Sequence, residues 1–494
     1  MIELNNSIIL AFSVYLLVIL GIALYAWHLT KDAHDYFLGG RRLSAFVAAF
    51  SAGASDMSGW VMLGLPGYAY LSGMEAGWMS IGLCIGVSAN WLLCAKRLRV
   101  YSLNLGDAVT IPTYLQRRFE DSAIWLKTVA AFFILLFFLF YIGSGLIGGA
   151  KLFESVFGLP YYTALFTGTG IIVFYTLFGG FLAVSWTDVF QAILMTLALV
   201  IVPVMVINLY GGVSDFEQSI NRINPALLDI WTDNKGQPLS TIAIASLLGW
   251  GLAYFGQPHI LARFKAIRSH KDVPRAAAIG VSWSLVIYVT AVLVGLSGAA
   301  YIPEPLQDSE KVFLIVTGTI FHPLVAGILL AALLAAIMST VDSQLLACSS
   351  TLSEDLYPLL GRKPLSKQQH LTIGRYAVAA IALISTAIAL DPNSKVLNVV
   401  AYAWGGLGAA FGPAMILSLY WPRMTRQGAL AGIIVGGLTV IVWRPLSGGI
   451  FDLYELVPGF FFALLSIIAV SLLTERPKDS VLREFIKMKT MINQ

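Results

Sequence analysis

The chain has 494 residues, of which 58% are hydrophobic and only 12% are charged. About a quarter of the residues of an ordinary soluble domain are charged, and a mean hydropathy of +0.79 leaves too little polar surface to cover a core in water. This composition excludes a soluble fold and points to lipid as the surrounding solvent. The net charge of +4, without a basic block, gives no reason to expect nucleic acid as a partner. Three cysteines in apolar stretches, without metal-ligand spacing, are expected to be small core residues: Cys84, Cys94 and Cys348.

Thirteen apolar runs, bounded by charged residues or by Gly, Pro and Asn, predict membrane-crossing helices. A helix needs about 20 apolar residues to cross the hydrocarbon layer. The ninth run is too long for one straight crossing, so we expect it to include a short helical lead-in with Phe321 and Pro323. We expect no cleaved signal peptide before the first run. In chain order the runs span 7–27, 45–71, 77–95, 125–150, 161–178, 187–209, 241–261, 277–300, 313–349, 372–390, 397–421, 428–443 and 453–473.

The basic residues indicate the orientation of these helices. With 13 crossings, 25 of the 31 Lys and Arg residues fall on one side of the membrane and 6 on the other. Basic residues are retained in cytoplasmic loops, so we expect a periplasmic N-terminus and a cytoplasmic C-terminus. A miscounted helix would have mixed the charges between the two sides, and the asymmetry therefore also supports an odd number of crossings.

The second run contains a segment that is poorly suited to a continuous helix. Between Ala49 and Trp60 it carries one acid, Asp56, with three serines and two glycines. Carbonyls freed at this depth are tolerated only where they line a cavity or bind something. Either the segment is a kink with satisfied polar groups, or it is a discontinuous transporter helix whose carbonyls bind a cation and whose ends face a substrate. Asp56 has no evident basic partner within a membrane run, which favours the cation.

The ninth run places several oxygen atoms on one face. Ala336, Ser339, Thr340 and Ser343 follow the spacing i, i+3, i+4 and i+7, so that one carbonyl and three hydroxyls lie together. Oxygen ligands suit hard cations such as sodium. The alternative is that the hydroxyls bond back to carbonyls of their own helix. Beside the broken second helix, we favour a cation site.

The seventh run combines aromatic rings with helix breakers. Trp250 and Tyr254 lie four residues apart, among glycines and before Pro258. Such rings are usually core packing, but the small residues leave room here for a compact organic solute. Tyr141 in the fourth run, before Gly143-Ser144-Gly145, is placed to add a hydroxyl from a third wall.

Other polar residues give weaker signals. Asp188, at the start of the sixth run, is either an N-terminal helix cap or an ion-coupling residue. His259 and His322 lie near apolar runs, but neither has a carboxylate set for a proton relay. No Walker phosphate loop, Ser/His/Asp arrangement or His-Glu-x-x-His zinc signature is present in the sequence. We therefore expect no catalytic residues, no cofactor and no ATP hydrolysis within this chain.

At these residues the chain resembles the sodium:solute symporter family, most closely its bacterial proline-transporting members. The resemblance extends over almost the whole chain, and its blocks are too long and unusual to arise by chance. The blocks are 36–41, 51–60, 143–154, 179–188, 249–264, 338–340 and 402–413.

The resemblance implies an all-α polytopic membrane protein with a LeuT-like fold. In that fold two inverted five-helix repeats, helices 2 to 6 and 7 to 11, form one transporter domain. The sequence itself supports this because each proposed half opens with a Gly-rich broken helix. The expected parts are an extra N-terminal helix (7–27), the first repeat (45–209), the second repeat (241–421), two C-terminal helices (428–473) and a cytoplasmic tail (474–494), together one domain (1–494).

The resemblance also implies roles for individual residues. Sodium would be the coupling ion, L-proline the solute, and Asp56 an essential acid in ion coupling, with Asp188 as a second candidate; the helix at 402–413 would be an outer gate. The implied sodium site uses main-chain oxygens of Ala54 and Met57 with Ala336, Ser339 and Thr340. The implied substrate residues are Ser58, Gly59, Tyr141, Trp250, Tyr254 and Pro258.

One residue departs from the family pattern. Asp342 is an acid where the proline-transporting members have a non-acidic polar stretch. An extra carboxylate there can tune ion affinity or serve a second ion step, so the one-to-one ratio of sodium to proline that the resemblance implies is less secure for this chain. We expect sodium-coupled proline uptake across a bacterial inner membrane by alternating access. The alternatives are a symporter for another small solute, a transporter-like sensor, for which the tail is too short to add a signalling domain, and a channel, which needs a continuous pore.

Overall fold

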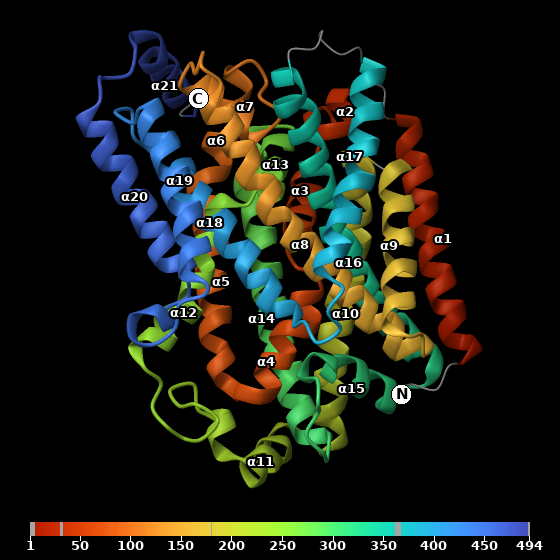
Figure 1. Ribbon diagram of the computed structural model, residues 1–494. Coiled ribbons are helices and arrows are strands. Elements are labelled where there is room, and N and C mark those ends of the chain that lie inside the picture. The colour runs from red at the N-terminus through yellow and green to blue at the C-terminus, as the bar shows by residue number, and fades with distance from the viewer. Residues whose placement is uncertain (1–4, 30–32, 179, 361–366, 493–494) are drawn as a thin grey trace.

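The computed structural model describes residues 5–29, 33–178, 180–360 and 367–492. Within these ranges the chain is almost entirely helical (Figure 1), and the strand-like pairings are two isolated bridges, Leu43 with Ile267 and Thr232 with Pro238. The α-helices are α1 (Asn6–Leu29), α2 (Ala33–Leu38), α3 (Ala45–Ala54), α4 (Leu65–Ser72), α5 (Ala76–Asn90), α6 (Lys96–Asn104), α7 (Ile111–Arg118), α8 (Trp125–Phe157), α9 (Tyr161–Phe178), α10 (Phe181–Leu209), α11 (Val213–Ile223), α12 (Thr241–Gly249), α13 (Pro258–Ala266), α14 (Val273–Tyr301), α15 (Val312–Ile320), α16 (Pro323–Ser350), α17 (Lys367–Ile388), α18 (Val396–Tyr420), α19 (Arg426–Trp443), α20 (Leu456–Leu473) and α21 (Asp479–Ile492).

Short turns of tighter or wider helix join several of these elements. They are η1 (Gly39–Arg41), η2 (Trp60–Gly64), η3 (Gly73–Glu75), η4 (Trp91–Ala95), η5 (Pro225–Leu228), η6 (Trp250–Gly256), η7 (His270–Asp272), η8 (Ser309–Lys311), η9 (Thr351–Leu356), η10 (Tyr357–Leu360) and η11 (Gly449–Asp452).

The described helices account for every predicted apolar run. Among the described residues, nine helical segments are long and apolar enough to cross a membrane, and four shorter apolar helices accompany them, at Ala45–Ala54, Tyr161–Leu177, Thr241–Gly256 and Thr372–Ile388. One of these nine segments, Trp60–Asn104, contains part of the second predicted run and all of the third. The polytopic all-α class is therefore confirmed, whereas the number of 13 crossings remains a prediction.

The structure corrects two boundaries. The ninth run is two helices, because α15 ends at Ile320 and α16 begins at Pro323 after a break at Phe321. The sixth helix begins at Phe181 rather than at residue 187, because Gly180 adopts a φ of 114° that a helix cannot continue through. Asp188 therefore lies inside α10, and its interpretation as an N-terminal helix cap is wrong.

Two helices are broken near the middle of the molecule. Helix α3 starts at Ser44, whose hydroxyl accepts a hydrogen bond from the amide of Val47, and stops at Ala54. The helical path resumes at η2 after Ser55–Gly59 and continues into α4. In the same way α12 gives way to η6, and α13 begins at Pro258. Freed carbonyls and helix ends thus occur in both segments where the sequence predicted them.

Glycine allows η6 to approach its neighbours closely. A Cβ atom at Gly251 would lie 2.0 Å from the carbonyl oxygen of Gly82 in α5, and one at Gly256 would lie 2.4 Å from that of Leu407 in α18. Any larger residue at either position would push these helices apart. The broken segment is therefore held directly against α5 and α18.

The helices pack into one bundle (Figure 1). Helix α16 lies among α1, α8, α10 and α17, while α3 contacts α10, α13 and α14. Helices α19 and α20 pair with each other and with α18 at one edge, and α1 lies at the opposite edge. This arrangement brings the breaks in α3–α4 and α12–α13 next to α8, α16 and α18.

Candidate functional site

A cluster of oxygen atoms joins the end of α3 to the middle of α16. The hydroxyl of Ser339 lies 2.8 Å from the carbonyl oxygen of Ala54 and 2.9 Å from that of Ala336. The hydroxyl of Thr340 lies 3.1 Å from the same Ala54 oxygen. All four residues are buried. The structure thus brings together four of the five residues predicted to hold sodium.

Met57 is the fifth predicted sodium residue, and its position is less direct. Its amide donates to the carbonyl of Gly53 at 2.9 Å, so the residue continues the turn that ends α3. In the described part of the chain, the hydrogen bonds from Ser339 and Thr340 to the broken helix go to Ala54 and not to Met57. Met57 lies in the same loop as the cluster but does not contact it through these bonds.

The neighbouring hydroxyl, that of Ser343, has different partners. It donates to the carbonyl of Ser339 at 2.7 Å and accepts a hydrogen bond from the guanidinium of Arg263. The alternative drawn from the sequence, in which hydroxyls bond back to their own helix, is thus correct for Ser343. Ser339 bonds both to its own helix and to α3.

Asp56 lies two residues beyond Ala54, inside a set of tyrosine hydroxyls. Its side chain is 1% exposed, and its carboxylate accepts a hydrogen bond of 2.6 Å from Tyr254. Tyr141 donates to the main-chain oxygen of Asp56 at 3.2 Å, and the hydroxyls of Tyr254 and Tyr288 are in contact. Among the ion pairs of the described residues, none involves Asp56. The carboxylate is therefore held by neutral donors, in line with the missing basic partner in the sequence.

Aromatic rings from four segments pack together beside Asp56, whose main-chain oxygen accepts a hydrogen bond of 2.9 Å from the indole nitrogen of Trp60. Trp404 of α18 lies edge-on to Tyr254 and Tyr141, with ring centroids 5.1 and 6.3 Å apart. The ring centroids of Trp60 and Trp250 lie 5.9 Å apart. The indole nitrogen of Trp404 donates a hydrogen bond to the carbonyl of Trp250 at 2.9 Å. We call these five residues the aromatic cage: Trp60, Tyr141, Trp250, Tyr254 and Trp404.

The remaining predicted substrate residues lie in different places. The hydroxyl of Ser58 accepts from the amide of Trp60 at 3.4 Å, at the edge of the aromatic cage. Gly59 instead packs against Ile337 of α16. A Cβ atom added at Gly59 would lie 3.2 Å from the side chain of Ile337. Pro258 lines another cavity, of about 30 Å³, together with Arg263. The structure therefore places Tyr141 and Tyr254 on Asp56 and Trp250 elsewhere in the aromatic cage, and it leaves Gly59 and Pro258 with other neighbours.

The space beside Asp56 is small in this conformation. A cavity of about 10 Å³ is lined by Asp56, Tyr254, Gly53 and Trp91, among others. A single water molecule needs about this volume, so an amino acid does not fit without movement of the surrounding helices. The arrangement is that of a closed site.

Asp188 takes part in a buried ion pair that the sequence analysis missed. Its carboxylate lies 3.3 Å from the guanidinium of Arg263 and accepts a hydrogen bond of 2.6 Å from Ser51. Arg263 also donates to Ser51 and Ser343, so it links α3, α10 and α16. The only sequence signal for Arg263 is its place in the short apolar segment after Pro258, beside the seventh run.

Asp342 is buried on another face of α16. Its carboxylate accepts a hydrogen bond from Thr176 of α9, and its second oxygen has no hydrogen-bond partner among the described residues. Asp342 is 1% exposed. The extra acid is therefore well ordered by α9 but is not part of the Ser339 cluster.

A second charge network lies at one end of the bundle. Lys151 of α8 pairs with Glu310 at 2.6 Å and with Asp308 at 2.9 Å. Glu310 also accepts hydrogen bonds of 2.9 Å from the amides of Val396 and Leu397, which begin α18. Burial alone would raise the pKa of Asp308, but its contacts with Lys395 and Lys151 lower it below the ordinary value. The loop at η8 thus fixes the first turn of α18.

The family model for the sodium:solute symporter family matches residues 36–436. The chain belongs to the sodium:solute symporter family. A sodium/proline symporter of Salmonella typhimurium is 47% identical over 490 residues, which are 98% of this chain and 96% of that protein. The high-affinity proline transporter PutP of Bacillus subtilis is 46% identical over 477 residues, which are 96% of this chain and 99% of that protein.

Solved structures agree with this assignment at the level of the fold. A sodium-coupled sialic acid symporter in a substrate-bound outward-open state superposes with a TM-score of 0.80 at 20% identity, over 96% of this chain and 99% of that one. A nucleobase-cation symporter in a closed conformation gives a TM-score of 0.55 at 13% identity, over 92% of this chain and 98% of that one. The LeuT-like fold expected from the sequence is therefore confirmed.

Proposed function

We propose that this protein takes up L-proline across the bacterial inner membrane, driven by the inward gradient of sodium. The observation that carries the proposal is the cluster of Ala54, Ser339 and Thr340, two residues from the carboxylate of Asp56 and its aromatic cage. Family membership supports sodium coupling, and the names of relatives at 46–47% identity support proline.

Sodium would replace hydrogen bonds that now join α3 to α16. The carbonyl oxygens of Ala54 and Met57, with Ala336 and the hydroxyls of Ser339 and Thr340, offer the hard oxygen ligands that suit this ion. Groups of three or more His, Cys, Asp or Glu that could hold a different metal do not occur among the described residues. A cation shared by both helices stabilises the arrangement in which α3 and α16 are close.

Proline would lie at the aromatic cage. Its pyrrolidine ring can pack against Trp250 and Tyr254, while its charged ends meet the ends of the broken helices, whose partial charges suit them. The substrate set proposed from the sequence is Ser58, Gly59, Tyr141, Trp250, Tyr254 and Pro258. Hydrogen bonds to Asp56 and ring contacts support Tyr141, Trp250 and Tyr254 most strongly.

Asp56 would couple the two ligands. It follows Ala54 of the sodium cluster by two residues, its carboxylate accepts a hydrogen bond from Tyr254 of the aromatic cage, and it forms no ion pair among the described residues, so it favours a bound cation in a site of low dielectric constant. Asp188, paired with Arg263, would instead fix the relative position of α3, α10 and α16.

Transport would follow alternating access without covalent chemistry. The proposed repeats, 45–209 and 241–421, each begin with a broken helix, and one would move against the other around the site. The proposed orientation has the N-terminus in the periplasm and the C-terminus in the cytoplasm. With 13 crossings, most basic residues fall on the same side of the membrane as the C-terminus.

Purified protein in vesicles would test this function. We expect uptake of labelled proline when sodium is outside, and little uptake in potassium buffer with a proton gradient. Unlabelled proline should compete, whereas hexoses should not, because the seventh-helix segment offers only Gln257 as an amide partner for sugar hydroxyls. Equal uptake in potassium buffer would disprove sodium coupling, and competition by a different solute alone would reassign the substrate.

A further inference from the structure

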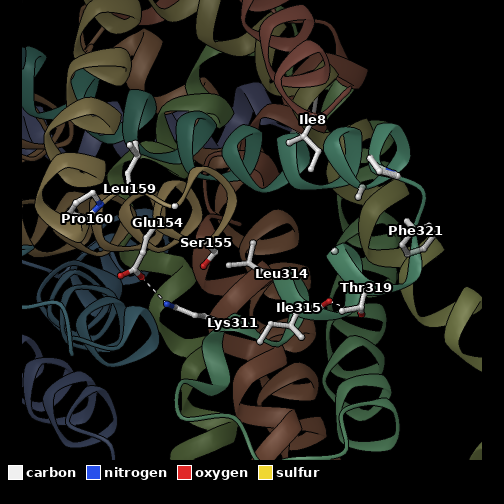
Figure 2. Close-up of a pocket in the computed structure, with 14 residues that line it drawn as sticks. Ile8, Glu154, Ser155, Leu159, Pro160, Lys311, Leu314, Ile315, Thr319 and Phe321 are labelled. Atoms are coloured by element: carbon white, nitrogen blue, oxygen red, sulfur yellow. Dashed lines mark hydrogen bonds and ion pairs between the residues drawn. The ribbon is translucent and has the colours of Figure 1, made fainter. Parts of the chain in front are cut away.

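A large cavity lies away from the aromatic cage. It has a volume of about 740 Å³ and is formed where α1 begins, where α8 ends, and along α15 and the start of α16 (Figure 2). None of its lining residues belongs to the sodium cluster or the aromatic cage. A volume of this size is typical of sites for small molecules. The cavity therefore needs its own explanation.

The walls of this cavity are mainly apolar. Ile8, Leu314, Ile315 and Phe321 surround it, with Leu159 at its edge (Figure 2). The neighbouring outer surfaces are apolar as well and would face lipid in a membrane, as the exposed fractions of Leu10 (57%), Tyr162 (53%), Phe166 (58%) and Leu324 (41%) indicate. Leu324 directly follows the lining residue Pro323, so an exposed apolar side chain lies next to the cavity wall.

One ion pair supplies the polar part of the cavity. The ammonium group of Lys311 lies 2.7 Å from the carboxylate of Glu154, and both side chains line the cavity (Figure 2). They remain 29% and 36% exposed, so a ligand can reach both. The pair lies where α8, a helix long and apolar enough to cross a membrane, ends and α15 begins, and the ends of crossing helices lie near the lipid headgroups.

We propose that this cavity binds one membrane phospholipid whose headgroup carries both an ammonium and a phosphate. Glu154 would accept hydrogen bonds from the ammonium, Lys311 would donate to the phosphate, and an acyl chain would pack against Leu314, Ile315 and Phe321. The Lys311–Glu154 pair has no net charge and therefore matches a headgroup without net charge. An anionic headgroup would be attracted by Lys311 but repelled by Glu154.

Bound lipid would also act on the transport cycle. Lys311 follows Glu310 directly, and Glu310 holds the first turn of α18 through the amides of Val396 and Leu397. A lipid on Lys311 would therefore steady the loop that fixes α18, one of the helices of the aromatic cage. The lipid site itself does not depend on the identity of the solute.

Lipid titration of the purified full chain would test the site. Protein in nanodiscs of phosphatidylcholine, whose methylated ammonium cannot donate hydrogen bonds, would be exchanged with increasing phosphatidylethanolamine or phosphatidylglycerol, and retained lipid counted by native mass spectrometry. We expect one retained phosphatidylethanolamine, with Lys311→Gln weakening its retention by about tenfold or more, as for loss of a charge-assisted hydrogen bond.

Matched variants separate this site from general effects on folding. Lys311→Arg keeps the charge and should retain the lipid, and Ile315→Trp should fill the cavity and reduce retention. Arg444→Gln removes an ion pair outside the cavity, between the exposed Arg444 and the buried Glu455 at 3.0 Å, and should leave retention unchanged. Equal retention in all variants, or stronger retention of phosphatidylglycerol, would overturn the proposal. Displacement of the lipid by free proline would make the cavity a solute site. These measurements need no sodium gradient, so failure of the proposed transport function would not affect them.

Discussion

At Asp56, the charge of the carboxylate and its hydrogen bonds can be separated by mutation. Asn keeps the size and can still accept from Tyr254, but it loses the negative charge. If the charge attracts the coupling ion, we expect Asp56→Asn to reduce sodium-driven uptake by at least about tenfold, the loss typical of one interaction with a charged group. Uptake in vesicles, normalised to protein in the membrane, measures this effect.

Tyr254→Phe is the matched control for that experiment. It removes the donor that lies 2.6 Å from Asp56 while leaving the charge in place, so its effect on sodium dependence should be smaller. Near-normal uptake by Asp56→Asn would instead support the interpretation of the segment as a kink with satisfied polar groups.

Thr340 tests the sodium cluster directly. Its hydroxyl reaches the carbonyl of Ala54 at 3.1 Å, and Thr340→Ala removes this oxygen with little loss of volume. We expect the sodium concentration for half-maximal uptake to rise by about 3- to 10-fold, the effect of losing one neutral ligand.

Thr386→Ala provides the comparison for Thr340, because the hydroxyl of this buried threonine bonds only to Ala382 within its own helix, α17. Its sodium dependence should stay at the wild-type value. An unchanged sodium requirement in Thr340→Ala would place the ion elsewhere.

At the scale of single elements, the sequence predicted what depends on local composition. Gly and Ser in the second run indicated a break, and the structure has α3 end at Ala54 and the helix resume at Trp60. The spacing of Ser339 and Thr340 placed their hydroxyls on one face, and the structure has both against Ala54. These features need only the period of a helix and the conformational preferences of its residues.

Features that depend on distant partners could not be predicted in this way. Arg263 counted as a basic residue of the cytoplasmic side, yet it is 2% exposed and pairs with Asp188, which is 75 residues away in the chain. Tyr288 gave no signal for the same reason, and Trp404 was included only as part of the gate helix 402–413, since only packing of α14 and α18 brings them to the site. The place of Pro258 was also missed, because a proline at a helix start does not reveal which cavity it lines.

The C-terminal helix α21 makes a further contact that composition did not indicate. Its Phe485 lies over the guanidinium of Arg118, 5.2 Å from the ring centroid, and Tyr101 and Phe119 provide two more rings at 5.4 and 4.9 Å. Arg118 is 1% exposed and donates to the carbonyl of Ser418 near the end of α18. The tail is therefore packed onto α6 and, through Arg118 of α7, linked to α18.

Truncation of Phe485 should destabilise the protein. Replacing a buried Phe by Ala typically costs about 3–5 kcal/mol, and here it would also uncover one face of Arg118. We expect Phe485→Ala to lower the thermal midpoint of the purified protein, measured by intrinsic fluorescence. Ile486→Ala, on the same helix and 62% exposed in the wild type, should have little effect. Equal midpoints for both variants would show that α21 contributes no stability through this contact.

At the scale of the whole molecule, the two ends of the chain lie on opposite sides. Helix α1 begins at one end of the bundle, and α21 lies at the other (Figure 1). An odd number of crossings requires this arrangement, and the excess of basic residues on the side of α21 supports the proposed orientation, in which that side is cytoplasmic. In the proposed orientation the proposed phospholipid cavity would lie at the periplasmic surface, because Ile8 at the start of α1 lines it.

Cysteine labelling in intact cells tests this topology. In a background with Cys84, Cys94 and Cys348 replaced by alanine, a single cysteine at the exposed Lys235 should react with a membrane-impermeant maleimide. A single cysteine at the exposed Arg476 should react only after the cells are permeabilised. The physical reason is that loop 210–240 and the tail are separated by seven of the 13 predicted crossings, which places them on opposite sides. Labelling of both positions in intact cells would show that one helix had been miscounted, and the reverse pattern would invert the protein and move the proposed lipid cavity to the cytoplasmic leaflet.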